Sequence, residues 1–235
     1  MKTILILGAS GELGSNLYKS LGEENYKIIG ADLRTCENTQ FKFDATCSSS
    51  IENLFQHCTE NDLNLDCVVN LIGKIHNQPF YNVMQTQKYI DDDTWREILA
   101  YNLETAFKIS KSYHRYCVGT KRKCNMINFS SVTSTGNPGQ LLYSIAKAGL
   151  ETLTKTLARE LGVQGHRFNC VSPGYINVTT TQAALSEKKA DAIINRIPLR
   201  SFGDVFSIHQ AVKLLIEAPY MNGAIIPVDG GYSIR

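Results

Sequence analysis

Apolar residues follow two different spacings along the chain. Short continuous apolar runs, typical of buried strands, lie near 3–7, 26–31, 41–43, 66–71, 124–130, 165–172 and 224–228. Apolar residues recurring every three or four positions predict helices near 12–22, 48–60, 93–117, 141–162, 180–194 and 207–217. Strands and helices that alternate in this way build right-handed βαβ units around a parallel sheet covered on both faces. The pattern predicts an α/β fold.

The chain has the length and composition of one globular unit. It contains 235 residues, 43% of them hydrophobic, without a linker, repeat or low-complexity segment. We therefore expect a single domain over residues 1–235. The two least regular stretches, 74–93 and 173–181, are expected to be loops, and long loops in compact domains are usually functional.

A glycine cluster follows the first predicted strand and precedes a helical pattern. Its glycines are Gly8, Gly11 and Gly14. This context is the one required of a dinucleotide fingerprint, in which the backbone approaches a pyrophosphate and the helix N-terminus offers free N–H groups. The second predicted strand ends on Asp32, at the distance where an acidic residue binds a ribose hydroxyl. An ordinary tight turn would explain the glycines alone, but the combination favours nucleotide binding.

Tyr143 and Lys147 are four residues apart at the start of the helix predicted over 141–162. Positions i and i+4 share one face of a helix, so a phenol and an ammonium would stand side by side. A neighbouring cation lowers the pKa of a tyrosine, which could then act as a general acid or base near neutral pH. The alternative for the pair alone is a solvated lysine over a packed ring.

Charge and cysteine content narrow the function classes. The net charge of +2 without a basic stripe does not suggest nucleic acid. The seven cysteines include no Cys-x-x-Cys and no zinc spacing, which predicts reduced thiols in a cytoplasmic protein and no metal site. The run 91–93 is interpreted as a helix N-terminal cap. We expect neither a signal peptide nor a membrane-spanning segment.

Nine short motifs in register resemble those of the short-chain dehydrogenase/reductase family, and the resemblance covers nearly the whole chain. They are Gly8-Ala-Ser-Gly-Glu-Leu-Gly14, Asp32, Asp44-Ala45, Asn70-Leu-Ile-Gly73, Trp95 with Asn102-Leu103, Asn128-Phe-Ser-Ser131, Tyr143-Ser-Ile-Ala-Lys147, Asn169-Cys-Val-Ser-Pro-Gly174 and Val228-Asp-Gly-Gly231. In its overall sequence pattern the chain most resembles the short, single-domain, 3-oxoacyl-carrier-protein-reductase-like members.

The resemblance implies a doubly wound, seven-stranded parallel sheet in a Rossmann-type three-layer sandwich. It also implies that Tyr143 transfers a proton to or from the substrate oxygen, and that Lys147 lowers the pKa of Tyr143 and holds the nicotinamide ribose. Asn102 would order a water near Lys147, and a serine at the end of the fifth strand would bind the carbonyl oxygen. The expected cofactor-binding residues are Gly8, Ser10, Gly11, Glu12, Leu13, Gly14, Asp32, Asp44, Asn70, Gly73, Tyr143, Lys147, Pro173, Gly174 and Ile176.

Three positions depart from the pattern of the short members. Gly8 and Gly11 enclose two residues instead of three, and Glu12 takes the later position. Only the outer residues of the run 70–73 match the usual Asn-Asn-Ala-Gly. Val178 stands where a threonine is expected, with Thr179 next, which leaves the threonine hydroxyl contact open, whereas the backbone contact of Ile176 to the carboxamide is still expected.

Ser130 and Ser131 compete for the role of the carbonyl-binding serine. The family's commonest interval to Tyr143 selects Ser130, whereas alignment of the strand selects Ser131. We choose Ser131 because loops absorb deletions, whereas a one-residue slip would invert the faces of a strand.

The sequence thus predicts an NAD(P)-dependent oxidoreductase that reduces a ketone or oxidises a secondary alcohol of a small molecule. A non-catalytic sensor or scaffold of the same fold is the alternative. Asp32 and the lack of a basic residue in the glycine turn favour NAD(H) over NADP(H), although Arg34 could bind a phosphate. The resemblance implies a homo-oligomer, a tetramer or a dimer, and leaves an acyl thioester, a sugar or a secondary metabolite open as substrate.

Overall fold

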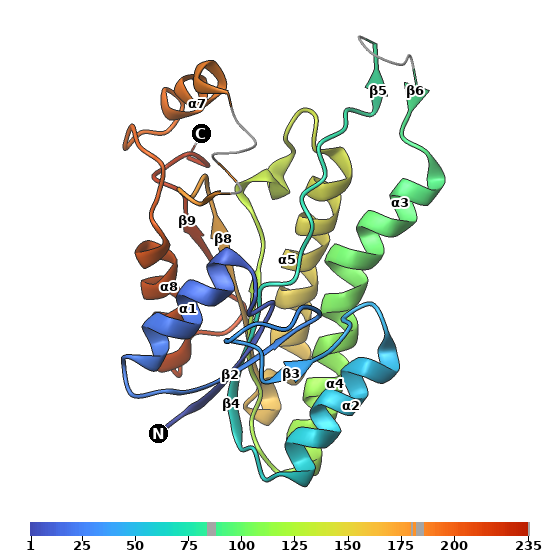
Figure 1. Ribbon diagram of the computed structural model, residues 1–235, viewed down its shortest axis with the longest axis vertical. Coiled ribbons are helices and arrows are strands. Elements are labelled where there is room, and N and C mark those ends of the chain that lie inside the picture. Colours follow the sequence, from blue (N-terminus) through green and yellow to red (C-terminus); the bar gives the residue numbers. More distant parts are fainter. Residues whose placement is uncertain (84–87, 180, 182–185, 235) are drawn as a thin grey trace.

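A computed structural model describes residues 1–83, 88–179, 181 and 186–234. Its centre is a seven-stranded sheet in the order β3-β2-β1-β4-β7-β8-β9, in which every neighbouring pair is parallel. The strands are β1 (Thr3–Leu7), β2 (Lys27–Asp32), β3 (Phe41–Lys42), β4 (Leu65–Asn70), β7 (Asn125–Phe129), β8 (Arg167–Pro173) and β9 (Ile225–Val228). The order reverses beside β1, so the sheet is doubly wound and the predicted fold class is confirmed (Figure 1).

Helices cover both faces of the sheet. They are α1 (Glu12–Gly22), α2 (Ser48–Glu60), α3 (Asp92–Leu99), α4 (Thr105–Gly119), α5 (Leu141–Leu161), α7 (Glu187–Ile194) and α8 (Val205–Glu217). Apolar residues of α1 and α8 pack in one core, and those of α2, α4 and α5 in the other. Among the described residues, no helix is long and apolar enough to cross a membrane.

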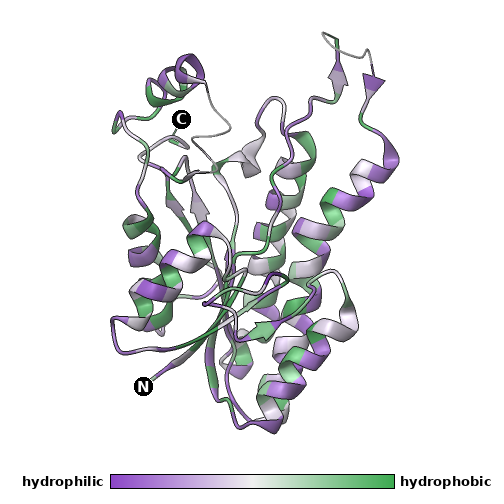
Figure 2. Cartoon of the chain, in the orientation of Figure 1, coloured by the Kyte–Doolittle hydropathy of each residue, from purple (hydrophilic) through white to green (hydrophobic). Residues whose placement is uncertain are grey.

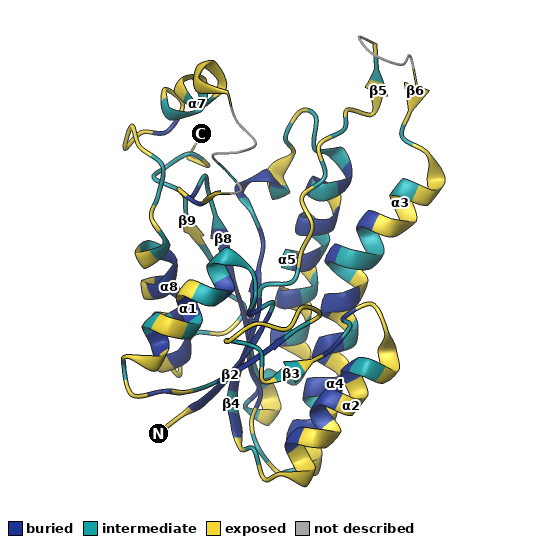
Figure 3. Cartoon of the chain, in the orientation of Figure 1, coloured by how far each residue is buried: buried dark blue, intermediate teal, exposed yellow. Residues whose placement is uncertain are grey.

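Residues of β1 alternate between the two cores. Ile4 and Ile6 belong to the core beneath α1 and α8, whereas Leu5 and Leu7 belong to the core beneath α2, α4 and α5. Because successive strand side chains point to opposite faces, a strand buried on both faces must be apolar throughout. This explains why β1 is a continuous apolar run in the sequence. Figures 2 and 3 show the buried, apolar strands between helices that have one apolar and one polar face.

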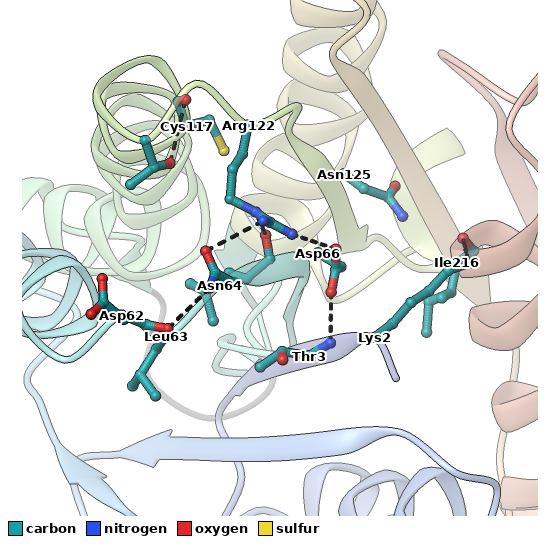
Figure 4. A network of polar contacts seen from close by, with 12 residues as sticks. Lys2, Thr3, Asp62, Leu63, Asn64, Asp66, Cys117, Arg122, Asn125 and Ile216 are labelled. Atoms are coloured by element: carbon teal, nitrogen blue, oxygen red, sulfur yellow. Dashed lines mark hydrogen bonds and ion pairs between the residues drawn. The ribbon is translucent and has the colours of Figure 1, made fainter.

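A polar network lies at the amino-terminal ends of the central strands (Figure 4). The Asp66 carboxylate accepts hydrogen bonds from the Thr3 backbone N–H at 2.8 Å and from Arg122 Nη2 at 2.6 Å. Arg122 Nε donates to the Leu65 carbonyl at 3.3 Å. These bonds tie β1 and β4 to the connection between α4 and β7, at the end of the sheet opposite the candidate site.

The helix predicted near 93–117 is interrupted. A π-helical segment, Ala100–Glu104, separates α3 from α4, and the Thr105 N–H bonds the Ala100 carbonyl five residues back. The prediction of one continuous helix is therefore wrong at this point. Its predicted start is confirmed, because Asp91 caps α3 by accepting from the Thr94 N–H at 2.7 Å.

The prediction of a loop over 74–93 also needs correction. The stretch 74–93 contains a small antiparallel hairpin, β5 (Tyr81–Asn82) with β6 (Lys88–Tyr89), which projects from the body beside α3 (Figure 1). Short 3-10 turns occur at Val132–Thr135 and Gly162–Gln164. The helix expected over 180–194 is confirmed only over its later part, as α7; residues 180 and 182–185 lie outside the described part of the chain.

Candidate active site

The glycine turn joins β1 to the N-terminus of α1. Gly14 lies in the first turn of α1, and a Cβ there would stand 2.1 Å from the carbonyl oxygen of Gly8, so only glycine allows the helix to start this close to the strand. Gly11 precedes the helix and provides no side-chain cap. The first amides of α1 thus face the carboxyl end of the sheet, where an anion can bind.

Asp32 ends β2 beside this turn. Its Oδ2 accepts from the Ser10 N–H at 3.0 Å and its Oδ1 accepts from the Arg34 N–H at 3.0 Å. Arg34 Nε donates to Ser10 Oγ at 3.0 Å and lies 4.0 Å from Asp32 Oδ1. The carboxylate is therefore fixed by backbone donors next to the predicted phosphate site, with one cation at its side.

Other predicted cofactor residues take structural hydrogen bonds. Asp44 Oδ1 accepts from the N–H and hydroxyl of Thr46, which holds the pKa of Asp44 below its usual value. Asn70 is buried, and its Nδ2 donates to Asn128 Oδ1 across neighbouring strands at 3.1 Å. Asp44 thus behaves as a turn residue, while an adenine contact stays a prediction.

Asn102 occupies the middle of the π-helical segment. Its Oδ1 accepts from the Lys74 N–H at 2.9 Å, and its Nδ2 donates to the carbonyls of Lys74 and Ile98. A Cβ placed on Gly73 would lie 3.1 Å from Asn102 Oδ1 and 3.2 Å from Lys147 Nζ. The backbone of Gly73 therefore lies against both predicted catalytic side chains. Single π turns inside α-helices are frequent at functional sites.

Lys147 is buried in α5, and its Nζ donates to the Phe129 carbonyl at 2.7 Å. Burial disfavours the ammonium and lowers the pKa of Lys147 to about 8. The Nζ lies 5.4 Å from the centre of the Tyr143 ring. The two side chains therefore share one face of the helix, as their spacing predicts.

The predicted lowering of the Tyr143 pKa by Lys147 is not found. Burial raises the pKa of Tyr143 to about 12, and hydrogen bonding with the Ser131 hydroxyl offsets part of that rise. The physical reason is that the ammonium bonds the Phe129 carbonyl while the phenol loses water on entering the site.

The two candidate serines point in different directions. The Ser131 side chain hydrogen-bonds Tyr143, and this bond lowers the pKa of the tyrosine. Ser130 is buried and donates to Glu151 Oε1 at 2.7 Å on α5. The geometry thus groups Tyr143 with Ser131, whose catalytic role remains a proposal.

The loop after β8 forms the other wall of the site. Pro173 ends β8, and Gly174 approaches Asp229 so closely that a Cβ would lie 2.7 Å from the Asp229 Cα. Ile176 is buried and bridges to Gly203. Beyond it, Thr179 contacts Glu12 of the glycine turn, a pairing that sequence reasoning missed because 167 residues separate the two. Leu13 packs against the same core as Ile176.

Sequence reasoning also missed Tyr175 and Asn137, which hydrogen-bond each other next to the turn before α5. Burial raises the pKa of Tyr175 to about 12. The position of Tyr175 directly after Pro173-Gly174, at the end of a predicted strand, was the sequence signal that could have identified it.

A separate cavity of about 670 Å³ lies at the amino-terminal ends of the strands. Lys2, Asp66, Asn125 and Arg167 are among its lining residues, and it contains none of the predicted site residues. Within the described ranges, no cluster of three or more His, Cys, Asp or Glu side chains could hold a metal.

These features fit a dinucleotide. Four features lie together at the carboxyl ends of the parallel strands, around the point where the strand order reverses. They are the N-terminus of α1, the Asp32 carboxylate, and the side chains of Lys147 and Asn102. That position is where open α/β sheets bind ligands. Fold and site together define a dinucleotide-dependent oxidoreductase of the Rossmann type.

Comparison with known proteins identifies the family. The family profile described as "Enoyl-(Acyl carrier protein) reductase" matches residues 17–233. The 3-oxoacyl-[acyl-carrier-protein] reductase FabG of Vibrio cholerae is 31% identical over 244 residues, covering 98% of this chain and 96% of the relative. The FabG of Haemophilus influenzae is 34% identical over 246 residues, covering 98% and 97%.

A solved structure of 4-hydroxyisoleucine dehydrogenase complexed with NADH is also similar. It has a TM-score of 0.87 at 25% identity and covers 99% of both chains. The chain belongs to the short-chain dehydrogenase/reductase family, and it is an NAD(P)-dependent oxidoreductase.

Proposed function

We propose that this protein reduces a ketone of a small organic substrate to a secondary alcohol, with Tyr143 as the proton donor. The observation that carries the proposal is the grouping of Tyr143 with Ser131 and Lys147 around Gly73 and Asn102. A bound nicotinamide supplies the hydride, which is chemistry of the cofactor that the protein positions.

Tyr143 suits the role of acid. Because its pKa is raised to about 12, its hydroxyl keeps its proton at neutral pH and can donate it to an oxygen that gains charge. Ser131 would donate a hydrogen bond to the same oxygen. Lys147 would hold the nicotinamide ribose and offset negative charge left on the phenolate. Asn102 acts as a positioning residue, because its amide fixes the backbone at Lys74 beside Lys147.

Asp32 supports a preference for NAD(H) over NADP(H). Its oxygens are fixed by two backbone donors and can also accept hydrogen bonds from both ribose hydroxyls. A 2′-phosphate there would meet like charge. Arg34, the nearby cation, already donates to Ser10 Oγ. We expect Asp32→Ala to lower kcat/KM with NADH and to raise it with NADPH, and a clear preference of the unmutated protein for NADPH would contradict this assignment.

The names of the relatives guide the choice of substrates. A screen should follow reduced-nicotinamide absorbance with NADH and NADPH against 3-oxoacyl thioesters, 2- and 4-oxo amino acids and sugar ketones. We expect Tyr143→Phe to lower turnover of the best substrate at least about a hundredfold, because general acid catalysis contributes about 10²–10⁴. Its NADH affinity should stay within about twofold, because only the proton donor is lost.

Tyr220→Phe is the matched control, because Tyr220 is fully exposed. It should leave both turnover and affinity unchanged. Retention of most activity by Tyr143→Phe would refute the mechanism.

A further inference from the structure

Glu12 joins the glycine turn to the loop after β8. Its Oε1 and Oε2 accept from the Thr179 backbone N–H at 2.9 and 2.8 Å, and its Oε1 also accepts from the Thr179 hydroxyl at 3.2 Å. Thr179 follows Val178 and Ile176, which are buried in the core beneath α1. One carboxylate thus connects the two walls of the proposed cofactor site.

The position of this carboxylate has an electrostatic consequence. Glu12 is the first residue of α1, where the free amides of the first turn and the positive end of the helix dipole attract an anion. A carboxylate there is stabilised by the same field that would bind a pyrophosphate. A pyrophosphate held by those amides would meet the Glu12 carboxylate as a like charge, and the bonds of Glu12 to Thr179 keep that carboxylate beside α1.

We propose that Glu12 is a positioning residue with two separable effects: its hydrogen bonds fix the segment 176–179 against α1, and its charge weakens dinucleotide binding. The inference rests on the proposed function, because it assigns the pyrophosphate to the α1 N-terminus. The charge would raise the Kd of the dinucleotide, while the fixed segment would keep Ile176 in position.

Two substitutions separate the effects. Glu12→Gln removes the charge but keeps an oxygen that can accept from the Thr179 N–H. Glu12→Ala removes both the charge and the acceptor. Glu23→Gln is the matched control, because Glu23 is exposed and lies just after the other end of the same helix.

The first measurement is the Kd for NADH by titration calorimetry at low ionic strength. We expect Glu12→Gln to bind NADH about fivefold more tightly, since a unit charge at about 4 Å in water contributes about 1 kcal/mol. Glu12→Ala should gain less, because it also frees the segment 176–179. The gain should shrink when salt is added, because salt screens exposed charges. Glu23→Gln should bind like the unmutated protein. Unchanged or weaker binding by Glu12→Gln would overturn the effect assigned to charge.

The second measurement is amide hydrogen exchange of the segment 176–179 without added dinucleotide. Glu12→Ala should exchange the Thr179 amide at least about tenfold faster, whereas Glu12→Gln should stay close to the unmutated protein. An unchanged rate in Glu12→Ala would overturn the assigned role in fixing the loop. Failure of the unmutated protein to bind either NADH or NADPH would instead refute the proposed function, and the exchange result would still test the contact.

Discussion

Asn102 holds both polar groups of the Lys74 backbone, because its Oδ1 accepts from the Lys74 N–H at 2.9 Å and its Nδ2 donates to the Lys74 carbonyl at 3.1 Å. Asn102→Leu would leave these groups and the Ile98 carbonyl without their partner. Of these bonds only the one to the Ile98 carbonyl is buried, and an unsatisfied buried group costs about 1–3 kcal/mol, so we expect a loss of about 1–3 kcal/mol in the free energy of unfolding. Urea denaturation measures it. A loss well below about 1 kcal/mol would contradict the prediction.

Ser130 and Ser131 should have opposite mutational signatures. Ser131→Ala removes a hydroxyl beside Tyr143 that also accepts from the Thr133 N–H at 3.2 Å, so we expect kcat to fall about a hundredfold with a loss of at most about 1 kcal/mol in stability. Ser130→Ala removes the donor to Glu151, so we expect a loss of about 1–2 kcal/mol in stability and a nearly normal kcat. Steady-state kinetics and urea denaturation of the two variants decide the assignment. A larger kcat loss in Ser130→Ala would reverse it.

Lys147 should destabilise the fold at neutral pH. Its pKa is about 8 in the folded protein, against 10.5 for a lysine that is not buried, so between these values the unfolded chain binds more protons. The free energy of unfolding should therefore rise with pH from about 8 to 10.5, while the cost of burying the ammonium is fully present below pH 8. The shift corresponds to roughly 3 kcal/mol.

Lys147→Met removes this titration and also removes the bond to the Phe129 carbonyl, which costs about 1–2 kcal/mol. We expect the variant to be inactive but more stable than the unmutated protein at pH 7, with the difference shrinking towards pH 10. Thermal denaturation across pH 6–10 tests this. The exposed Lys155→Met, on the same helix, should give a pH-independent difference. A Lys147→Met difference that does not vary with pH would argue against a neutralised lysine.

The outer face of α4 and α5 should carry the predicted self-association. Phe107 and Val118 of α4 are 51% and 57% exposed, and Ile145 of α5 is 37% exposed. We propose that a second copy covers them, since single-chain burial leaves this apolar surface in water. Light scattering at micromolar concentration should give a dimer or tetramer that Phe107→Asp dissociates. A monomeric unmutated protein would refute the proposal.

The sequence predicted the sheet because its central strands are buried on both faces and hence largely apolar, as in β1 and β4. It did not predict the hairpin β5–β6, whose contacts run across strands, with the Tyr81 and Tyr89 rings 4.8 Å apart. It also missed the π-helical segment, although an asparagine in the middle of a helix was a usable signal, because such side chains compete for backbone groups.

The site was predicted where motifs are local, as for Tyr143 and Lys147 on one helix. It was not predicted where the environment decides the chemistry. Spacing alone indicated a lowered pKa for Tyr143, whereas burial raises it. The bond between Glu12 and Thr179 likewise depends on how β8 ends beside α1, which no local pattern contains.

The π-helical segment makes the catalytic geometry sensitive to chain length. A π turn holds about one residue more than an α turn, so deleting one residue within 100–104 would let α3 and α4 join as a continuous α-helix. The faces of α4 that carry Ile109 and Tyr113 could stay buried, and the fold would survive. Asn102 would lose its hydrogen bonds to the Lys74 backbone, so a single-codon deletion would disturb the candidate catalytic site while leaving the helix and its packing in place.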